Sequence, residues 1–205
     1  MTVVVIDTGL GNLRSVEKAL AVANAGATIA RSDQPDVVRS ADRIVFPGQG
    51  AFRDCMRTLE SGLGEAIVEK IRAGTPYLGI CLGLQVLFES SAEAPDVAGL
   101  GLYAGAVERL TNDGGVKIPH MGWNELELTG GGHALLDAAG GADTWVYFVH
   151  SYHAVPDDES LVVARVMHGK NIVTAAIARE NVFATQFHPE KSQKAGLALL
   201  AAFLR

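Results

Sequence analysis

The residues best suited to chemistry surround one cysteine, in the segment Tyr77–Gln85, which reads Y-L-G-I-C-L-G-L-Q. A short apolar run ends at Cys81, which stands between two glycines, and an apolar segment able to form a helix follows from Leu84 to Ser90. A nucleophile on a tight strand-to-helix turn needs this arrangement, because glycines allow a sharp bend and keep bulk away from the sulfur. The free N–H groups at a helix start favour the thiolate. We therefore predict a nucleophilic Cys81, with the Leu82 amide facing a developing oxyanion; the alternative is a small buried hydrophobe.

A second candidate segment, Gln186–Glu190, reads Q-F-H-P-E and follows the apolar run Val182–Ala184. The proline pushes His188 toward an extended conformation, in which residues i and i+2 face the same side. Glu190 can then orient the imidazole, and an imidazolium in turn stabilises a thiolate. Cys81, His188 and Glu190 would supply the nucleophile, the general base and the orienting group of an acyl-transfer triad. The alternative is a capping histidine and a solvated glutamate.

Strands and helices alternate in the part of the chain that leads to the cysteine. The patterns predict strands at Thr2–Ile6, Ala27–Ala30 and Arg43–Phe46, a helix at Leu13–Ala23, and a helix or helix pair at Ala51–Ala73, broken near Gly62 and Gly64. Such alternation is typical of a parallel sheet with helices on both faces. Ligands bind at the carboxyl ends of these strands, so the turn at Pro47–Gly50 and Cys81 should lie on one rim.

After Ala98 the sequence changes to short extended segments separated by glycine-rich turns. These segments are Leu100–Leu102, Ala106–Leu110, Trp123–Leu128, Trp145–Val149, Leu161–Met167, Asn171–Ala178 and Val182–Ala184. We predict antiparallel strands added to the sheet of the first half, and a closing helix at Lys194–Leu204. The fold expected for residues 1–205 is a single α/β domain with a mixed, mainly parallel central sheet.

Composition restricts the classes of function. The net charge of −6 gives no electrostatic reason to expect nucleic acid or an anionic membrane as a partner. The chain shows no basic leader and no apolar stretch of the roughly 18 residues that a membrane span needs. Two cysteines in 205 residues fit a reducing compartment, and we expect a cytoplasmic protein.

The segment G-I-C-L-G-L-Q with a downstream F-H-P-E resembles the class I, triad-type glutamine amidotransferases. More specifically, the chain resembles the glutaminase subunits of imidazole glycerol phosphate synthases. Two stretches distinguish that subfamily, Pro119–Asn124 and Glu190–Gln193. The resemblance extends along the chain through Asp7–Asn12 with Ser15, Pro47–Gly50, Gly79–Gln85, Phe148–Tyr152 and Gln186–Gln193. It implies a flavodoxin-like fold and hydrolysis of L-glutamine to glutamate and ammonia through a cysteinyl thioester, with no cofactor.

The resemblance also implies roles for individual residues. Cys81 would be the nucleophile, His188 the general base and acid, and Glu190 the group that orients the histidine. The oxyanion hole would use the backbone amides of Leu82 and Gln49. Residues implied to hold the substrate are Gly50, Gln85, Ser151 and Tyr152, and those at the contact with a partner are His120, Met121, Trp123 and Asn124.

The implied partner is a cyclase subunit, a (β/α)₈ barrel that uses the ammonia to make imidazole glycerol phosphate and an aminoimidazole carboxamide ribotide in histidine biosynthesis. Nothing in these 205 residues resembles a synthase domain, so we expect the acceptor chemistry elsewhere. The alternatives are a glutaminase serving another synthase, such as pyridoxal phosphate synthase, and a cysteine-elbow stress or binding protein without glutaminase activity.

Three other features favour structural interpretations. The G-x-G-x-x-G pattern after Asp7 is incomplete, with Arg14 in place of the third glycine. Cys55 reads as a partly buried helix residue. His150 and His153 have the spacing of a helical metal pair, but they follow a predicted strand and lack further ligands at suitable spacing, so we expect no metal site.

Overall fold

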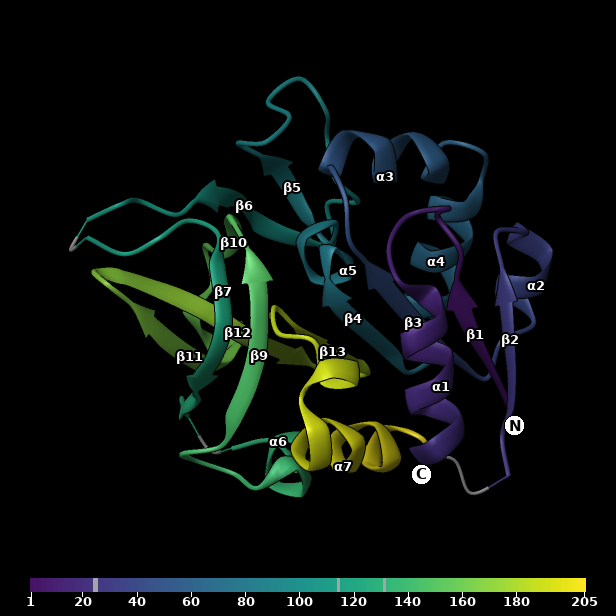
Figure 1. The fold of residues 1–205 in the computed structure, drawn as a ribbon. Coiled ribbons are helices and arrows are strands. Elements are labelled where there is room, and N and C mark those ends of the chain that lie inside the picture. Colours follow the sequence, from purple (N-terminus) through teal and green to yellow (C-terminus); the bar gives the residue numbers. More distant parts are fainter. Residues whose placement is uncertain (24–25, 114, 131) are drawn as a thin grey trace.

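An eight-stranded sheet runs through the middle of the protein (Figure 1). The computed structural model describes residues 1–23, 26–113, 115–130 and 132–205. The first five strands in the sheet order are parallel and the last three are antiparallel. In order, they are β2 (Thr28–Ser32), β1 (Thr2–Ile6), β3 (Arg43–Gly48), β4 (Tyr77–Cys81), β13 (Val182–Thr185), β12 (Asn171–Arg179), β11 (Val162–His168) and β8 (Glu127–Leu128). The predicted mixed, mainly parallel sheet is confirmed.

Helices cover both faces of this sheet because its central strands are apolar on both sides. Alternate residues of β1 enter different cores, Val4 and Ile6 on one face and Val3 and Val5 on the other. The first core is covered by α2 (Pro35–Arg39), α3 (Phe52–Leu59) and α4 (Leu63–Arg72), and the second by α1 (Leu13–Ala23), α6 (Ala134–Ala139) and α7 (Gln193–Phe203). Among the described residues, no helix is long and apolar enough to cross a membrane.

Two small sheets stand beside the large one and account for the rest of the extended segments. One contains β10 (Tyr152–Pro156), β6 (Tyr103–Arg109) and β5 (Phe88–Ser91), and the other pairs β7 (His120–Glu125) with β9 (Trp145–His150). The expectation that the later strands would extend the first sheet therefore holds for β12, β11 and β8. The other strands form separate layers on the two faces of the antiparallel half: β9 shares one core with β11 and β12, and β6 and β10 share the other core with β12 (Figure 1).

The segment after the cysteine differs from the prediction. A helix was expected from Leu84 to Ser90, but α5 spans only Leu82–Gln85 and β5 begins at Phe88. A continuous apolar run is buried in either conformation, so its pattern does not separate helix from strand. The predicted strand at Leu100–Leu102 is a loop, although its amides donate to the carbonyls of residues 86, 87 and 88.

The predicted break in the helix of residues 51–73 is confirmed. α3 and α4 are separate helices, and Gly62 between them has a φ of 90°, which glycine adopts without strain. The two short helices α2 and α6 were not predicted, because five or six residues show too little periodicity.

Candidate active site

Cys81 lies at the turn between β4 and α5, at the carboxyl end of a fully buried strand. Its backbone has φ 54° and ψ −101°, in a region that residues with a Cβ rarely adopt. The sharp bend that the sequence suggested for the neighbouring glycines is therefore made by the cysteine itself. This strained turn raises the sulfur above the sheet edge, beside the first amides of α5.

The glycines around Cys81 are needed for close approach. Gly79 and Gly83 have ordinary φ values, but a Cβ on Gly83 would lie 2.0 Å from the carbonyl oxygen of Phe46. A Cβ on Gly79 would lie 2.4 Å from the oxygen of Gly83, and one on Gly48 would lie 2.4 Å from Cβ of Leu82. Because these positions carry no side chain, α5 packs directly on β3 and β4, which fixes the position of Cys81.

The neighbouring strand β13 brings His188 to the same rim. β13 pairs with β4 in parallel, with Thr185 opposite Ile80, so the chain leaves the sheet beside the cysteine. The His188 amide donates to the Tyr147 carbonyl at 2.9 Å, and the Ser192 hydroxyl donates to the His188 carbonyl at 2.7 Å. The backbone of the histidine is therefore held on both sides.

Glu190 completes a buried pair with this histidine. Nδ1 of His188 and Oε1 of Glu190 are 2.8 Å apart, and the two side chains are only 1% and 3% exposed. His188 has the extended backbone expected from its position before proline, with φ −101° and ψ 99°, whereas Glu190 lies in a 3-10 turn, Pro189–Lys191. The contact with an acidic oxygen fixes Nδ1 as the protonated nitrogen and turns Nε2 toward the cysteine side.

The charge state of His188 follows from its surroundings. Burial alone would lower its pKa, but the neighbouring Cys81 side chain and the Glu190 carboxylate outweigh burial and raise the pKa to about 10. Nε2 has no hydrogen-bonding partner of suitable geometry among the described residues, although the Cys81 side chain lies close enough to raise the pKa of the ring. The raised pKa favours the protonated ring, which is the form that can donate a proton.

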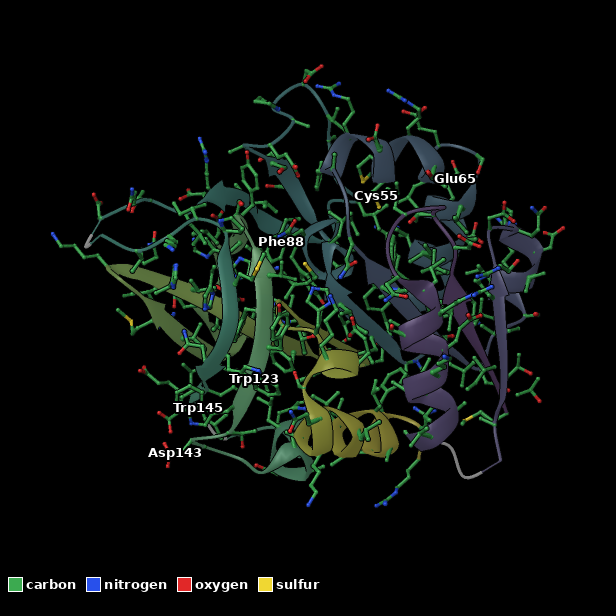
Figure 2. The ribbon with its side chains drawn as sticks, viewed as in Figure 1. Cys55, Glu65, Phe88, Trp123, Asp143 and Trp145 are labelled. Carbon is green, nitrogen blue, oxygen red and sulfur yellow. The ribbon has the colours of Figure 1, made fainter. Side chains whose placement is uncertain are left out.

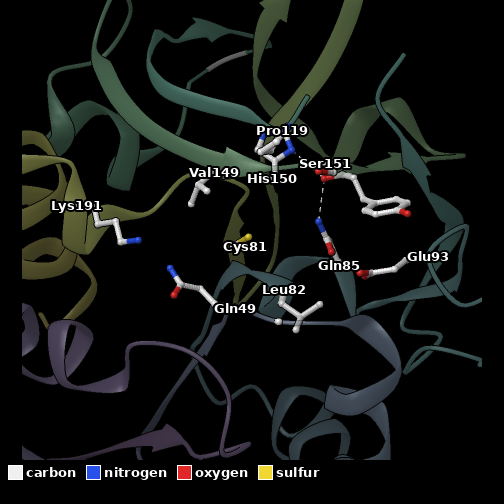
Figure 3. A pocket seen from close by; sticks show the side chains of 12 residues that line it. Gln49, Cys81, Leu82, Gln85, Glu93, Pro119, Val149, His150, Ser151 and Lys191 are labelled. Atoms are coloured by element: carbon white, nitrogen blue, oxygen red, sulfur yellow. Dashed lines mark hydrogen bonds between the residues drawn. The ribbon is translucent and has the colours of Figure 1, made fainter. Parts of the chain in front are cut away.

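A pocket of about 470 Å³ opens above the sulfur (Figure 3). Cys81 and Leu82 form its base, and the structure places every predicted substrate and oxyanion residue around it: Gln49, Gly50, Gln85, Ser151 and Tyr152. His188 and Glu190 lie behind the nucleophile, where they line a separate small cavity beneath the turn at Pro47–Gln49. The pocket therefore exposes the sulfur and hides the two residues that would control its protonation.

Several pocket residues were not predicted from the sequence. Glu93, His150 and Lys191 also line the cavity. Glu93 follows β5, which was predicted as a helix, so nothing placed it near the site; its carboxylate accepts from the Phe52 amide at 3.0 Å. Lys191 stands in the distinguishing stretch after the triad, and the sequence alone could have drawn attention to it.

Gln186 is a further residue whose position only the fold reveals. Its side-chain Nε2 donates to Sγ of Cys81 at 3.3 Å, and its Oε1 accepts from Nε2 of Gln85 at 3.1 Å. Gln85 Nε2 also donates to the Tyr152 carbonyl at 3.0 Å, drawn as a dashed line in Figure 3. The amide nitrogen of Gln85 is thus fully used, and its oxygen is the atom left for a substrate.

The residues predicted for the partner contact divide between the two sides of β7. Met121 and Trp123 point outward and are 62% and 41% exposed, and Trp123 lies near Trp145 in Figure 2. His120 is only 4% exposed and bonds to His150 at 3.1 Å, and Asn124 donates to the Met167 carbonyl at 2.9 Å. The prediction that His120 contacts a partner is therefore corrected, because alternation along the strand turns its ring into the protein.

Two further histidines and the second cysteine are buried, and burial shifts their pKa values. Burial lowers the pKa of His150 to about 3 and that of His153 to about 4. Cys55 is fully buried in α3, where burial raises its pKa to about 12. In the described part of the chain, no group of three or more His, Cys, Asp or Glu side chains is placed to hold a metal ion.

Comparisons with known proteins identify the family of the chain. The family described as "Glutamine amidotransferase class-I" matches residues 4–205. The imidazole glycerol phosphate synthase subunit HisH of Thermosynechococcus vestitus is 51% identical over 98% of this chain and 95% of its own length. That of Methylococcus capsulatus is 49% identical over 100% and 96%.

Solved structures show the same fold at lower identity. A glutamine amidotransferase crystal structure matches with a TM-score of 0.72 and 21% identity over 98% of both chains. The PurLQS structure from Thermotoga maritima matches with a TM-score of 0.72 and 20% identity over 99% of this chain and 97% of that one. With the site geometry and the full-length matches together, the chain belongs to the class I glutamine amidotransferases, in the family of the HisH subunits of imidazole glycerol phosphate synthase.

Proposed function

We propose that Cys81, His188 and Glu190 hydrolyse the side-chain amide of L-glutamine, the reaction of this family. The Cys81 sulfur attacks the amide carbon and forms a tetrahedral intermediate. Its oxyanion accepts from the Leu82 amide and, in our proposal, from the Gln49 amide. His188 gives its proton to the leaving nitrogen, ammonia departs and a thioester remains. Water then attacks the thioester, with His188 as the base, and glutamate is released.

One observation carries this proposal. A buried imidazole, paired with a buried carboxylate at 2.8 Å, places its positive charge beside a cysteine that forms the base of an open pocket. A cysteine-elbow protein without glutaminase activity would need no histidine there, and the relatives disfavour that alternative. The pocket also contains Glu93 and Lys191, whose opposite charges suit the α-ammonium and α-carboxylate of a free amino acid.

We propose that Gly50, Gln85, Ser151 and Tyr152 hold that amino acid. All four line the pocket around the sulfur, and Gln85 offers its side-chain oxygen. The domain would be a single unit over residues 1–205. Both cysteines are free, and we propose a cytoplasmic location.

The ammonia needs an acceptor on another chain, because in neutral water it is mostly protonated and loses its nucleophilic lone pair. The relatives are named as subunits of imidazole glycerol phosphate synthase, which implies a synthase partner. We propose that this partner is a (β/α)₈-barrel cyclase that makes imidazole glycerol phosphate and an aminoimidazole carboxamide ribotide. The outward side chains of Met121 and Trp123 would contact it, since large apolar side chains are enriched at interface centres.

The test uses the complex with the cyclase and two nitrogen sources. The Cys81→Ala variant is expected to lose glutamine-dependent synthesis, by a factor of about 10⁴ or more, and to keep ammonia-dependent synthesis. Cys55→Ala is the matched control and is expected to keep both. Glutamine turnover that persists in the Cys81→Ala complex would refute the assignment of the nucleophile.

A further inference from the structure

We propose that Gln186 is a positioning residue that holds the Cys81 sulfur as a thiolate by donating an N–H from its side-chain amide. This inference rests on the proposed role of Cys81 and extends it. Gln186 is fully buried and directly follows β13. Its backbone amide donates to the Ala175 carbonyl at 2.8 Å. A buried polar side chain must find partners, and here one of them is the nucleophile itself, at 3.3 Å.

The direction of this hydrogen bond follows from a chain of contacts that ends at a backbone carbonyl. The oxygen of Tyr152 can only accept, so the group that Gln85 presents to it at 3.0 Å must be the NH₂. That same NH₂ lies 3.1 Å from Gln186, which must therefore present its oxygen. The remaining end of the Gln186 amide, its NH₂, faces the sulfur. The Tyr152 carbonyl oxygen therefore determines the orientation of the side-chain amides of both Gln85 and Gln186.

A donor aimed at the sulfur distinguishes between its two charge states. Hydrogen bonds to a charged group are worth about twice those to a neutral one, so the N–H of Gln186 favours the thiolate over the thiol. It also directs the sulfur, because the amide is locked at its far end by Gln85. His188 supplies charge from one side and Gln186 supplies an oriented dipole from another.

The experiment measures alkylation of Cys81 by iodoacetamide against pH, with no glutamine present, in the complete chain. Mass spectrometry separates the two cysteines, and buried Cys55 serves as an internal control. The titratable groups that face the sulfur or its pocket stay unchanged in every variant: His188, Glu190, Glu93, His150, Tyr152 and Lys191.

The Gln186→Met variant keeps the length of the side chain and removes the donor. We expect the pH of half-maximal alkylation to rise by about one unit or more. If that variant does not fold, Gln186→Glu replaces it, and a larger rise is expected because a carboxylate would face the sulfur. The matched control is Thr185→Val, which removes an equally buried hydrogen bond, to the Phe187 carbonyl at 2.9 Å, on the same strand.

An unchanged midpoint in Gln186→Met would overturn the inference, and so would an equal rise in Thr185→Val, which would indicate general loosening. Neither result would touch the proposed function, which Cys81→Ala tests separately through glutamine turnover. The role proposed for Gln186 is therefore tested only by the pH dependence of Cys81 alkylation.

Discussion

Buried histidines in two places beside the strand β9 have pKa values shifted in opposite directions. His188 bonds through its backbone to Tyr147, and its pKa is raised to about 10 against the effect of burial. His150, at the end of the same strand, contacts His120, and burial lowers their pKa values to about 3 and 4. All three residues are histidines, all three are buried, and each lies on β9 or contacts it. The difference lies in the partners, a carboxylate and a sulfur in one case and neutral groups in the other.

This comparison shows what makes a buried histidine useful for acid–base chemistry. Burial alone removes the proton and leaves a neutral ring that serves as a hydrogen-bonding spacer. His150 is such a spacer, because its Nδ1 must donate to the Tyr152 carbonyl at 2.9 Å and its Nε2 must then accept from His120. Only a negative partner on each side of the ring, as at His188, restores the charge inside the protein.

The largest expected effect is on glutamine hydrolysis, when one buried histidine in each environment is replaced by glutamine. His188→Gln removes the proposed general base, and we expect glutamine hydrolysis by the complex to fall by about 10⁴ or more. His153→Gln changes a ring that is also buried but has a pKa lowered to about 4 and lies outside the pocket lining. We expect less than about a tenfold loss there. Similar losses in steady-state assays of both variants would remove the functional contrast between the two environments.

A second prediction concerns stability against pH. His188 has a folded pKa above its unfolded value of 6.5, so its contribution is fully present below pH 6.5 and is lost as pH rises through about 10. His120, His150 and His153 have folded values below 6.5, so their contributions are present above it and are lost as pH falls toward 4 and 3. Each group changes the unfolding free energy by at most ~1.4 kcal/mol per pH unit.

Urea unfolding midpoints measured as a function of pH test the expected loss of stability at acid and at alkaline pH. We expect greatest stability near neutral pH and a shallower acid slope in His153→Gln, while His188→Gln should flatten the alkaline side. An acid slope that is the same in His153→Gln as in the parent protein would show that this ring is protonated as easily when folded as when unfolded.

The smallest expected effect is on affinity for the cyclase, when a side chain on the outward face of β7 is truncated. Trp123→Ala should weaken binding to the cyclase by about 1–3 kcal/mol, because it truncates an exposed aromatic side chain, and should leave the histidines behind it in place. Val22→Ala on α1, across the molecule in Figure 1, is an exposed apolar control that should change nothing. Calorimetric titration of the two variants with the cyclase measures the difference. Equal affinities would place the interface elsewhere.

Local patterns predicted the parts of the site that depend on neighbours in sequence. The run into Cys81 with its glycines predicted a turn, and the spacing of His188 and Glu190 predicted a pair, although a 3-10 turn at Glu190 and not a continuous extended segment brings the two side chains together. The β-branched run of residues 2–6 likewise predicted a buried strand. These features need no knowledge of distant segments.

The features that sequence reasoning missed depend on contacts between distant segments. Gln186 meets Cys81 across 105 positions, and no pattern in either segment encodes that contact. Phe88 lies in a strand because β6 is available to pair with it, and an apolar run reads equally well as a helix. The inward turn of His120 follows from its pairing with His150 on β9, which sets the face of each residue in β7.

The position of β13 between β4 and β12 has a consequence for synthesis of the protein in the cell. Translation yields the N-terminal strands first, and they can begin to fold while the rest of the polypeptide is still being made. The space beside the nucleophile stays empty until one of the last strands inserts there. A nascent chain on the ribosome is therefore expected to be catalytically silent, and glutamine is spared until a finished subunit exists.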